Sequence, residues 1–188
     1  DHRDLHLSLR RQRQMCIRDS SMNEEVYFDM INQKTASLIA TSCELGAITT
    51  TKEKKDREAT FSFGDNLGMA FQIKDDLFDL LGNENDTGKN AGGDVKKNMA
   101  TLPLIYSKSN MSRSGHRELK KLLDVKKKSK SVISKICTII EDAGGVDYAR
   151  KKLDEFSQKA VDSIMPYPDS PVRQSMLDLV EFNASRVK

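Results

Sequence analysis

With 188 residues, the chain is long enough to bury the core of one ordinary domain. Charged residues make up 31% of it and hydrophobic residues 37%, with no tryptophan and only four prolines, which favours a helical protein over a β-sandwich or a disordered chain. The net charge is +3, and the first twenty residues, with five arginines against three aspartates, supply +2 of it, so no nucleic acid or anionic membrane surface is expected as a partner.

The three cysteines, Cys16, Cys43 and Cys137, are widely spaced and form no Cys-x-x-Cys motif. An odd number without metal-ligand spacing favours free thiols over disulfides or zinc, and hence a reducing compartment. No apolar run approaches the roughly 18 residues of a membrane span, and no stretch has the pattern of a signal peptide. We therefore expect a soluble, cytoplasmic protein.

Residues 1–20 have no regular hydrophobic period, and Met15–Ser20 resembles a translated sequencing-adapter end. We interpret residues 1–20 as an irregular, non-native head and exclude it from the fold. On this interpretation the natural chain is cut just upstream of Ser21, and residues 21–188 are the C-terminal part of a longer domain.

Two long helices are expected first. One starts at Ser21, which forms a capping box with Glu24, and continues to about Gly46 with apolar residues at helical spacing. It carries Lys34-Thr35. Taken alone, Lys34 is most simply interpreted as a lysine on a solvated face. The second covers about residues 57–81, where Gly64 and Gly68 stand one turn apart in a helix interior, which predicts a close backbone neighbour.

The second helix ends in three carboxylates, Asp75, Asp76 and Asp79. On an α-helix Asp75 and Asp79 share one face, with Asp76 beside them, so we expect the three acids to project toward one point. Carboxylate oxygens are hard donors that suit magnesium or calcium better than zinc. This pattern predicts a magnesium site with a phosphate ligand.

A loop rich in Asn, Asp and Gly follows at residues 82–93 and contains Lys89. It is well placed to fold over a bound phosphate, with Lys89 as a point charge, although an ordinary solvated loop is the alternative. A further helix should start at Thr101 with Pro103 in its first turn. The remaining expected helices are amphipathic packing helices at about residues 118–125, 132–142, 146–165 and 170–186. The lysine-rich run at residues 126–130 is interpreted as a solvated face or turn, and His116 is placed in a loop.

Five elements occur in a fixed order between residues 34 and 105. They are Lys34-Thr35-Ala36-Ser37-Leu38; Gly46-Ala47; Gly64-x-x-x-Gly68-x-Ala70-Phe71-Gln72-Ile73-x-Asp75-Asp76-x-x-Asp79; Gly88-Lys89-x-x-Gly92-x-Asp94; and Thr101-Leu102-Pro103-Leu104-Ile105. Together they resemble the trans-prenyltransferases, the polyprenyl diphosphate synthase family. The resemblance covers about residues 21–188 and implies an all-α isoprenoid synthase bundle, N-terminally truncated, of six to seven helices.

That family joins an allylic diphosphate to isopentenyl diphosphate head-to-tail, using Mg²⁺ held between two aspartate-rich helices. The resemblance implies that Asp75, Asp76 and Asp79 form the second of these metal-binding clusters. It also assigns the remaining site residues as follows: Lys34 and Lys89 bind the allylic diphosphate, Thr35 and Gln72 lie near the reacting carbon, with Lys34 as a further catalytic group, and Phe71 lines the homoallylic site next to Gln72.

Two departures from the family pattern affect these expectations. Met99 stands where the family usually has a lysine, with Lys96 and Lys97 nearby, and the first aspartate-rich motif is absent from the 188 residues. The chain should therefore be inactive by itself, while the full-length enzyme should be a homodimer. The alternative is a noncatalytic partner subunit of a heteromeric synthase. A terpene cyclase or a plain structural helical domain explains the five elements less well.

Overall fold

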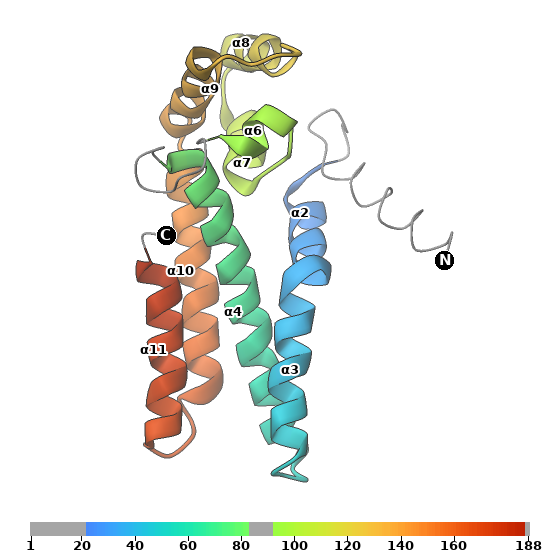
Figure 1. Ribbon diagram of the computed structural model, residues 1–188, viewed down its shortest axis with the longest axis vertical. Helices are drawn as coiled ribbons and strands as arrows, with labels where there is room; N and C mark the ends of the chain where they lie inside the picture. Colours follow the sequence, from blue (N-terminus) through green and yellow to red (C-terminus); the bar gives the residue numbers. More distant parts are fainter. Residues whose placement is uncertain (1–21, 83–91, 187–188) are drawn as a thin grey trace, which may run out of the picture. The chain divides into compact units, whose positions relative to one another are not determined.

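The computed structural model describes residues 22–82 and 92–186, and all regular structure within these ranges is helical. The head at residues 1–20, including Cys16, and the loop residue Lys89 lie outside the described residues. The helices are α2 (Glu24–Ile31), the π-helical turn η1 (Asn32–Ala36), α3 (Ser37–Ile48), α4 (Lys54–Leu81), α6 (Gly93–Lys97), α7 (Leu102–Asn110), α8 (Arg113–Leu123), α9 (Lys130–Asp142), α10 (Gly145–Ile164) and α11 (Pro171–Ser185) (Figure 1).

The expected helices are all present, with several changes at their ends. Asn23 caps α2, because its Oδ1 accepts from Val26 N at 2.9 Å, and the helix begins at Glu24. Helix α8 starts five residues earlier than expected because the Ser112 side chain caps it, so His116 lies in a helix and not in a loop. The short α6 was not expected from the sequence. Among the described residues no helix is long and apolar enough to cross a membrane.

The described chain divides into two compact units. The first combines the stretch up to Tyr27 with Asp76–Tyr148, and the second combines Phe28–Asp75 with Ala149–Lys188. The division falls inside α2 and α10 and, in α4, between Asp75 and Asp76. The two aspartates therefore belong to different units although they are consecutive residues of one helix.

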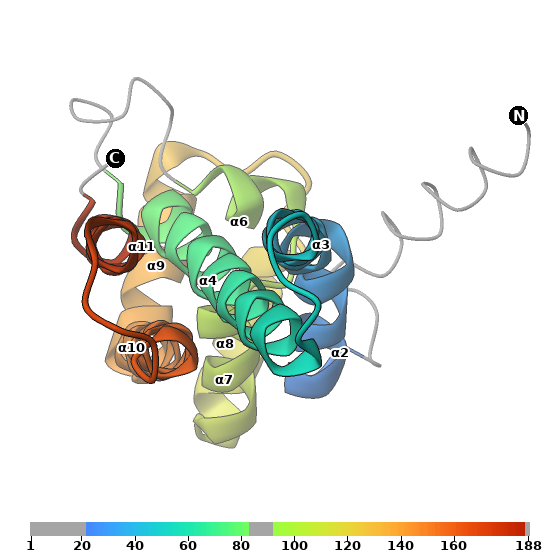
Figure 2. The ribbon, with the colours of Figure 1, turned by 90° about the horizontal axis from the view of Figure 1, so that it is seen from below.

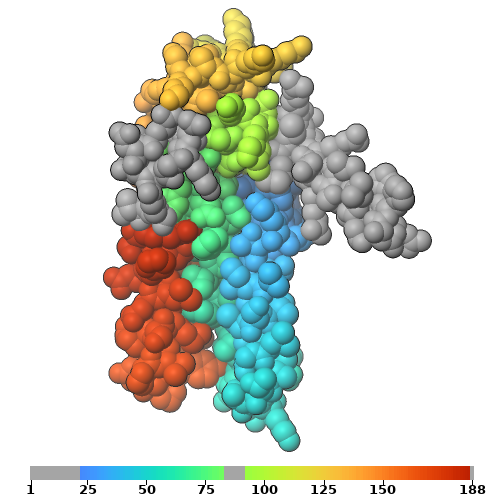
Figure 3. Space-filling model, in the orientation of Figure 1, coloured from blue at the N-terminus to red at the C-terminus, as the bar shows by residue number. Residues whose placement is uncertain are grey.

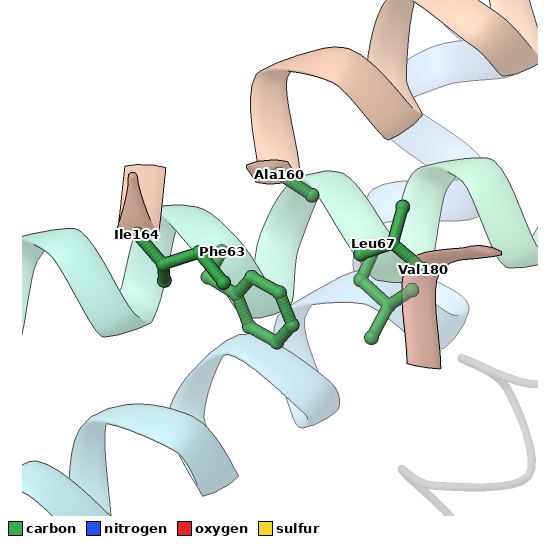
Figure 4. Packing of buried hydrophobic residues seen from close by; sticks show 5 residues of the cluster. All are labelled: Phe63, Leu67, Ala160, Ile164 and Val180. Carbon is green, nitrogen blue, oxygen red and sulfur yellow. The ribbon is translucent and has the colours of Figure 1, made fainter. Parts of the chain in front are cut away.

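The second unit packs α4 against α10 and α11 through a core of aromatic and aliphatic side chains. Helices α10 and α11 lie side by side in two perpendicular views (Figure 1 and Figure 2). Figure 4 shows the cluster at their contact with α4; it consists of Phe63, Leu67, Ala160, Ile164 and Val180. This packing holds the part of α4 that belongs to the second unit, up to Asp75. Helix α3, coloured cyan, has one face exposed in the space-filling view (Figure 3). Leu38, a residue of this helix, is 72% exposed.

The first unit is built around α9, which packs against α6, α7 and α8. The buried Ser107 hydroxyl of α7 donates to the Ile140 carbonyl of α9 at 3.0 Å. A Cβ atom at Gly145 would overlap the backbone carbonyl of Pro103, so only glycine permits the start of α10 to lie this close to α7. The lysine-rich run expected to be solvated contains one exception: Lys128 is buried, and its Nζ donates to Asn98 Oδ1 at 2.7 Å.

Candidate functional site

Two glycines bring α4 into backbone contact with the helix that carries Lys34-Thr35. A Cβ atom at Gly68 would lie 2.5 Å from Ala36 Cα, and one at Gly64 would lie 2.8 Å from Ala40 Cα. Real Cβ atoms do not approach a backbone this closely, so a larger residue at either position would push the helices apart. The close approach predicted from the glycine spacing is confirmed.

The Lys34-Thr35 pair lies in η1, a single π-helical turn between α2 and α3. Such turns insert an extra residue into a helix and are common at functional sites. Thr35 is brought to α4, where its Oγ1 donates to Gln72 Oε1 at 2.9 Å. In the same turn Asn32 Nδ2 donates to Asp65 Oδ1 at 2.6 Å. The structure thus brings together Thr35 and Gln72, and it leaves the Lys34 side chain exposed.

Asp75 lies in the second unit and is paired with a residue that sequence reasoning missed. Arg186, at the end of α11, contacts Asp75 Oδ1 through Nη2 at 2.6 Å. The guanidinium also lies 4.3 Å from the centre of the Phe71 ring and donates to the Phe71 carbonyl. The Asp75 side chain is 41% exposed, whereas that of Arg186 is 13% exposed. Asp75 is therefore open to solvent on one side and held by a cation on the other.

Lys74 also joins α4 to the end of α11, since its Nζ donates to the Ala184 carbonyl at 2.6 Å. Burial lowers the pKa of Lys74, and the positive charges of Arg186 and Arg150 lower it further. Two consecutive side chains of α4, at positions 74 and 75, thus bind the last turn of α11.

Asp76 belongs to the first unit and is 7% exposed. The hydroxyl of Tyr27, a residue of α2 that is fully buried, donates to Asp76 Oδ2 at 2.8 Å. Burial raises the pKa of Tyr27 well above its usual value, and the negative charge of Asp76 raises it further, so the phenol stays protonated and remains a donor.

Asp79 holds the start of α6. Its Oδ2 accepts from Asp94 N at 2.8 Å, and its backbone carbonyl accepts from Gly92 N at 2.7 Å. Gly92 has a φ of 74°, which favours glycine, and a Cβ atom at Gly93 would lie 2.9 Å from Asp79 Oδ1. The two glycines therefore let the backbone at the start of α6 lie directly against the Asp79 carboxylate.

The sequence predicted that the three carboxylates face one point. They do not, because Asp76 is directed to the buried Tyr27. Among the described residues, no group of three or more His, Cys, Asp or Glu side chains is arranged to hold a metal ion. Asp75 and Asp79 still share one face of α4 one turn apart. Two carboxylates fit magnesium in chemistry and number, since it usually takes one or two, with water and substrate phosphate completing its shell.

Near Thr101, the position expected to carry a lysine is a half-buried methionine, Met99. Lys96 and Lys97 at the end of α6 are exposed. Asn98, the residue before Met99, has a φ of 59° and accepts a hydrogen bond from Lys128. Lys128, 30 residues beyond Asn98 in the chain, thus reaches this turn.

Comparison with protein families finds a match to polyprenyl synthetase over residues 6–140. Among curated proteins, the octaprenyl diphosphate synthase of Haemophilus influenzae is 29% identical over 175 residues, which cover 93% of this chain and 53% of that protein. Component 2 of the heptaprenyl diphosphate synthase of Bacillus subtilis is 29% identical over 164 residues, covering 87% of this chain and 46% of that protein. The chain thus spans about half the length of these relatives.

Solved structures of prenyl synthases have a similar fold. A geranylgeranyl pyrophosphate synthetase from Pyrococcus horikoshii is 27% identical with a TM-score of 0.83, and the match covers 98% of this chain and 59% of that one. A polyprenyl synthase from Caulobacter crescentus, solved in complex with calcium and isoprenyl diphosphate, is 26% identical with a TM-score of 0.82, covering 99% of this chain and 60% of that one. The expected all-α isoprenoid synthase fold is confirmed.

Proposed function

Because the chain belongs to the polyprenyl synthetase family, we propose that it forms part of an enzyme that condenses an allylic diphosphate with isopentenyl diphosphate, head-to-tail and with Mg²⁺. The observation that carries the proposal is the Thr35–Gln72 hydrogen bond, which lies one turn before Asp75 along α4. It brings two of the expected catalytic side chains together beside the aspartate-rich end of the helix.

Ionisation of an allylic diphosphate leaves a carbocation and a pyrophosphate anion, so groups that stabilise either charge lower the barrier. The oxygens of Thr35 and Gln72 are suited to face the positive carbon. The exposed Lys34 ammonium, carried by the same π-helical turn as Thr35, is suited to bind the diphosphate. Phe71 remains a predicted residue of the homoallylic site; it is 37% exposed, and its ring packs against the Arg186 guanidinium.

Bound magnesium would neutralise the departing pyrophosphate. Asp75 and Asp79 remain the predicted ligands, since the helical period puts them one turn apart and Asp75 is open to solvent. Lys89 lies outside the described residues and remains a predicted diphosphate ligand. The relative solved with calcium and isoprenyl diphosphate supports this combination of metal and substrate.

The first aspartate-rich motif expected by resemblance is not among the 188 residues, so we propose that this chain alone does not turn over. A homodimer of the full-length enzyme and a cytoplasmic location remain predictions. Cys43 and Cys137 are free thiols. The second candidate is a noncatalytic partner subunit of a heteromeric synthase, for which the only support is the match to a relative named as one component of a synthase.

Calorimetric titration of the chain with farnesyl thiolodiphosphate, an unreactive allylic analogue, tests the proposal. Binding should require MgCl₂ and disappear with EDTA. Lys34→Ala should weaken it about tenfold, as expected for one charge-assisted hydrogen bond. Lys55→Ala, which removes another exposed lysine of the second unit, should leave it unchanged. Equal affinity for the analogue with and without magnesium would contradict the proposed metal site.

Turnover separates the two candidates. The chain is incubated with farnesyl diphosphate, radiolabelled isopentenyl diphosphate and MgCl₂, alone and after addition of extracts fractionated from its source. Longer labelled products from the chain alone would contradict the expected inactivity. Products that appear only with a second, different polypeptide would favour the partner-subunit reading.

A further inference from the structure

Three neighbouring carboxylates of α4 have three different surroundings. Asp75 is half exposed and paired with Arg186, Asp79 accepts from the start of α6, and Asp76 is buried against Tyr27. At about 100° per residue, Asp76 points about 100° away from Asp75 around the helix. The burial and the direction of Asp76 distinguish it from the other two.

The Tyr27–Asp76 contact has the properties of a fixed anchor. Tyr27 is 0% exposed and Asp76 is 7% exposed, and their oxygens lie 2.8 Å apart. A charge-assisted hydrogen bond to a buried group is strong, and breaking it leaves a buried phenol without that acceptor. Asp76 therefore cannot turn outward to a cation without giving up this contact.

We propose that Tyr27 is a positioning residue, which acts through Asp76 to fix the rotation of the end of α4. Asp79 follows Asp76 by three residues in the same unit, so holding Asp76 inward also sets the direction of the Asp79 carboxylate. Asp76 then serves as the anchor of the motif and not as a ligand. This inference rests on the proposed function, since it assumes that Asp75 and Asp79 bind a metal.

A purely structural role for the same hydrogen bond makes a different prediction. If Tyr27 only stabilised the fold, its removal would lower the melting temperature without changing metal affinity in the folded protein. A positioning role requires the affinity itself to fall. The second unit offers a matched control, because Tyr167 donates to Asp56 Oδ1 at 2.9 Å, which is the same pair of groups far along α4 from the motif.

The test is binding of Mn²⁺, measured from the free-ion EPR signal, to the 188-residue chain in the presence of inorganic pyrophosphate. Tyr27→Phe should weaken Mn²⁺ binding about tenfold, the lower end of the effect of removing an outer-shell partner. Tyr167→Phe should not change the affinity. Asp75→Asn should weaken it by more than tenfold. Asp76→Asn should weaken it less than about fivefold, because the amide oxygen still accepts from Tyr27.

Two outcomes would overturn the inference while leaving the proposed function intact. One is an affinity unchanged in Tyr27→Phe. The other is a loss in Asp76→Asn as large as in Asp75→Asn, which would make Asp76 a ligand. Should Tyr27→Phe fail to fold, the comparison of Asp76→Asn with Asp75→Asn still decides whether Asp76 is an anchor or a metal ligand. Absence of Mn²⁺ binding by the unsubstituted chain would overturn the proposed metal site and this inference together.

Discussion

Asp75 and Asp76 are consecutive residues of one helix, yet the contacts around them are of opposite kinds. Asp75, in the second unit, meets an arginine at a partly exposed position. Asp76, in the first unit, meets a tyrosine in the interior. The Asp75 side chain is 41% exposed, so water and salt compete for it and its ion pair contributes little to stability, whereas a buried hydrogen-bonded carboxylate is costly to disturb.

The difference teaches that a repeated residue type need not have a repeated function. The exposed carboxylate can exchange its partner for another cation at small cost, which suits a group that binds a ligand. The buried one cannot, which suits a group that fixes geometry. Substitutions of Asp76 should therefore affect mainly stability, and substitutions of Asp75 mainly binding.

The largest expected difference in stability is between the two neighbouring aspartates. Asp76→Ala leaves the buried Tyr27 hydroxyl without this acceptor and should lower the free energy of unfolding by about 2–3 kcal/mol. Asp75→Ala should change it by less than about 1 kcal/mol. Urea unfolding followed by circular dichroism measures both. Equal losses would show that the two sides of the motif do not differ in the way described.

A smaller effect is expected at Gly93, in the first unit. A methyl group there would lie 2.9 Å from Asp79 Oδ1, so Gly93→Ala should displace this carboxylate and cost about 1–2 kcal/mol in unfolding free energy. Gly115→Ala is the control, because its new Cβ would meet only ordinary contacts at 3.6 Å or more, and in helix α8 it should be neutral or slightly stabilising. Stabilisation by Gly93→Ala would contradict the close contact.

The smallest effect should come from Arg186. Arg186→Ala removes the contacts with Asp75 and the Phe71 ring, and we expect a loss of about 1 kcal/mol that shrinks as salt is added. Arg186→Lys keeps the charge but not the planar group, so it should recover only part of this loss. Thermal melts at low and high NaCl concentration measure the effect. A loss independent of salt would mean that packing dominates over charge.

Much of the helical frame could be predicted from sequence, because helical period and glycine spacing are local properties. Gly64 and Gly68 indicated a close neighbour, and the order of motifs related Thr35 to Gln72. Tyr27 could not be recognised in the same way, since it stands among the apolar residues of an amphipathic helix and its partner is 49 residues away. From the sequence, Tyr27 could not be distinguished from an ordinary core residue.

Other features depend on partners even more distant in the chain. Arg186 lies 111 residues from Asp75, and the burial of Lys128 depends on Asn98, 30 residues away. Nothing in a local pattern distinguishes these two basic residues from solvated ones. The early start of α8 is different: Ser112 is a typical capping residue, and that signal was available in the sequence.

The contact of α4 with α3 and η1 also determines how the site can vary. Gly68 faces Ala36 and Gly64 faces Ala40, so two small residues spaced by one turn meet two others with the same spacing. If one helix slid along the other by less than a full turn, larger side chains would meet the backbone. Sliding is therefore limited to whole helical turns, about 5.4 Å each. The alignment of Thr35 with Gln72 is therefore set in discrete positions by the small residues at the helix contact, and gradual sliding of these helices cannot adjust it.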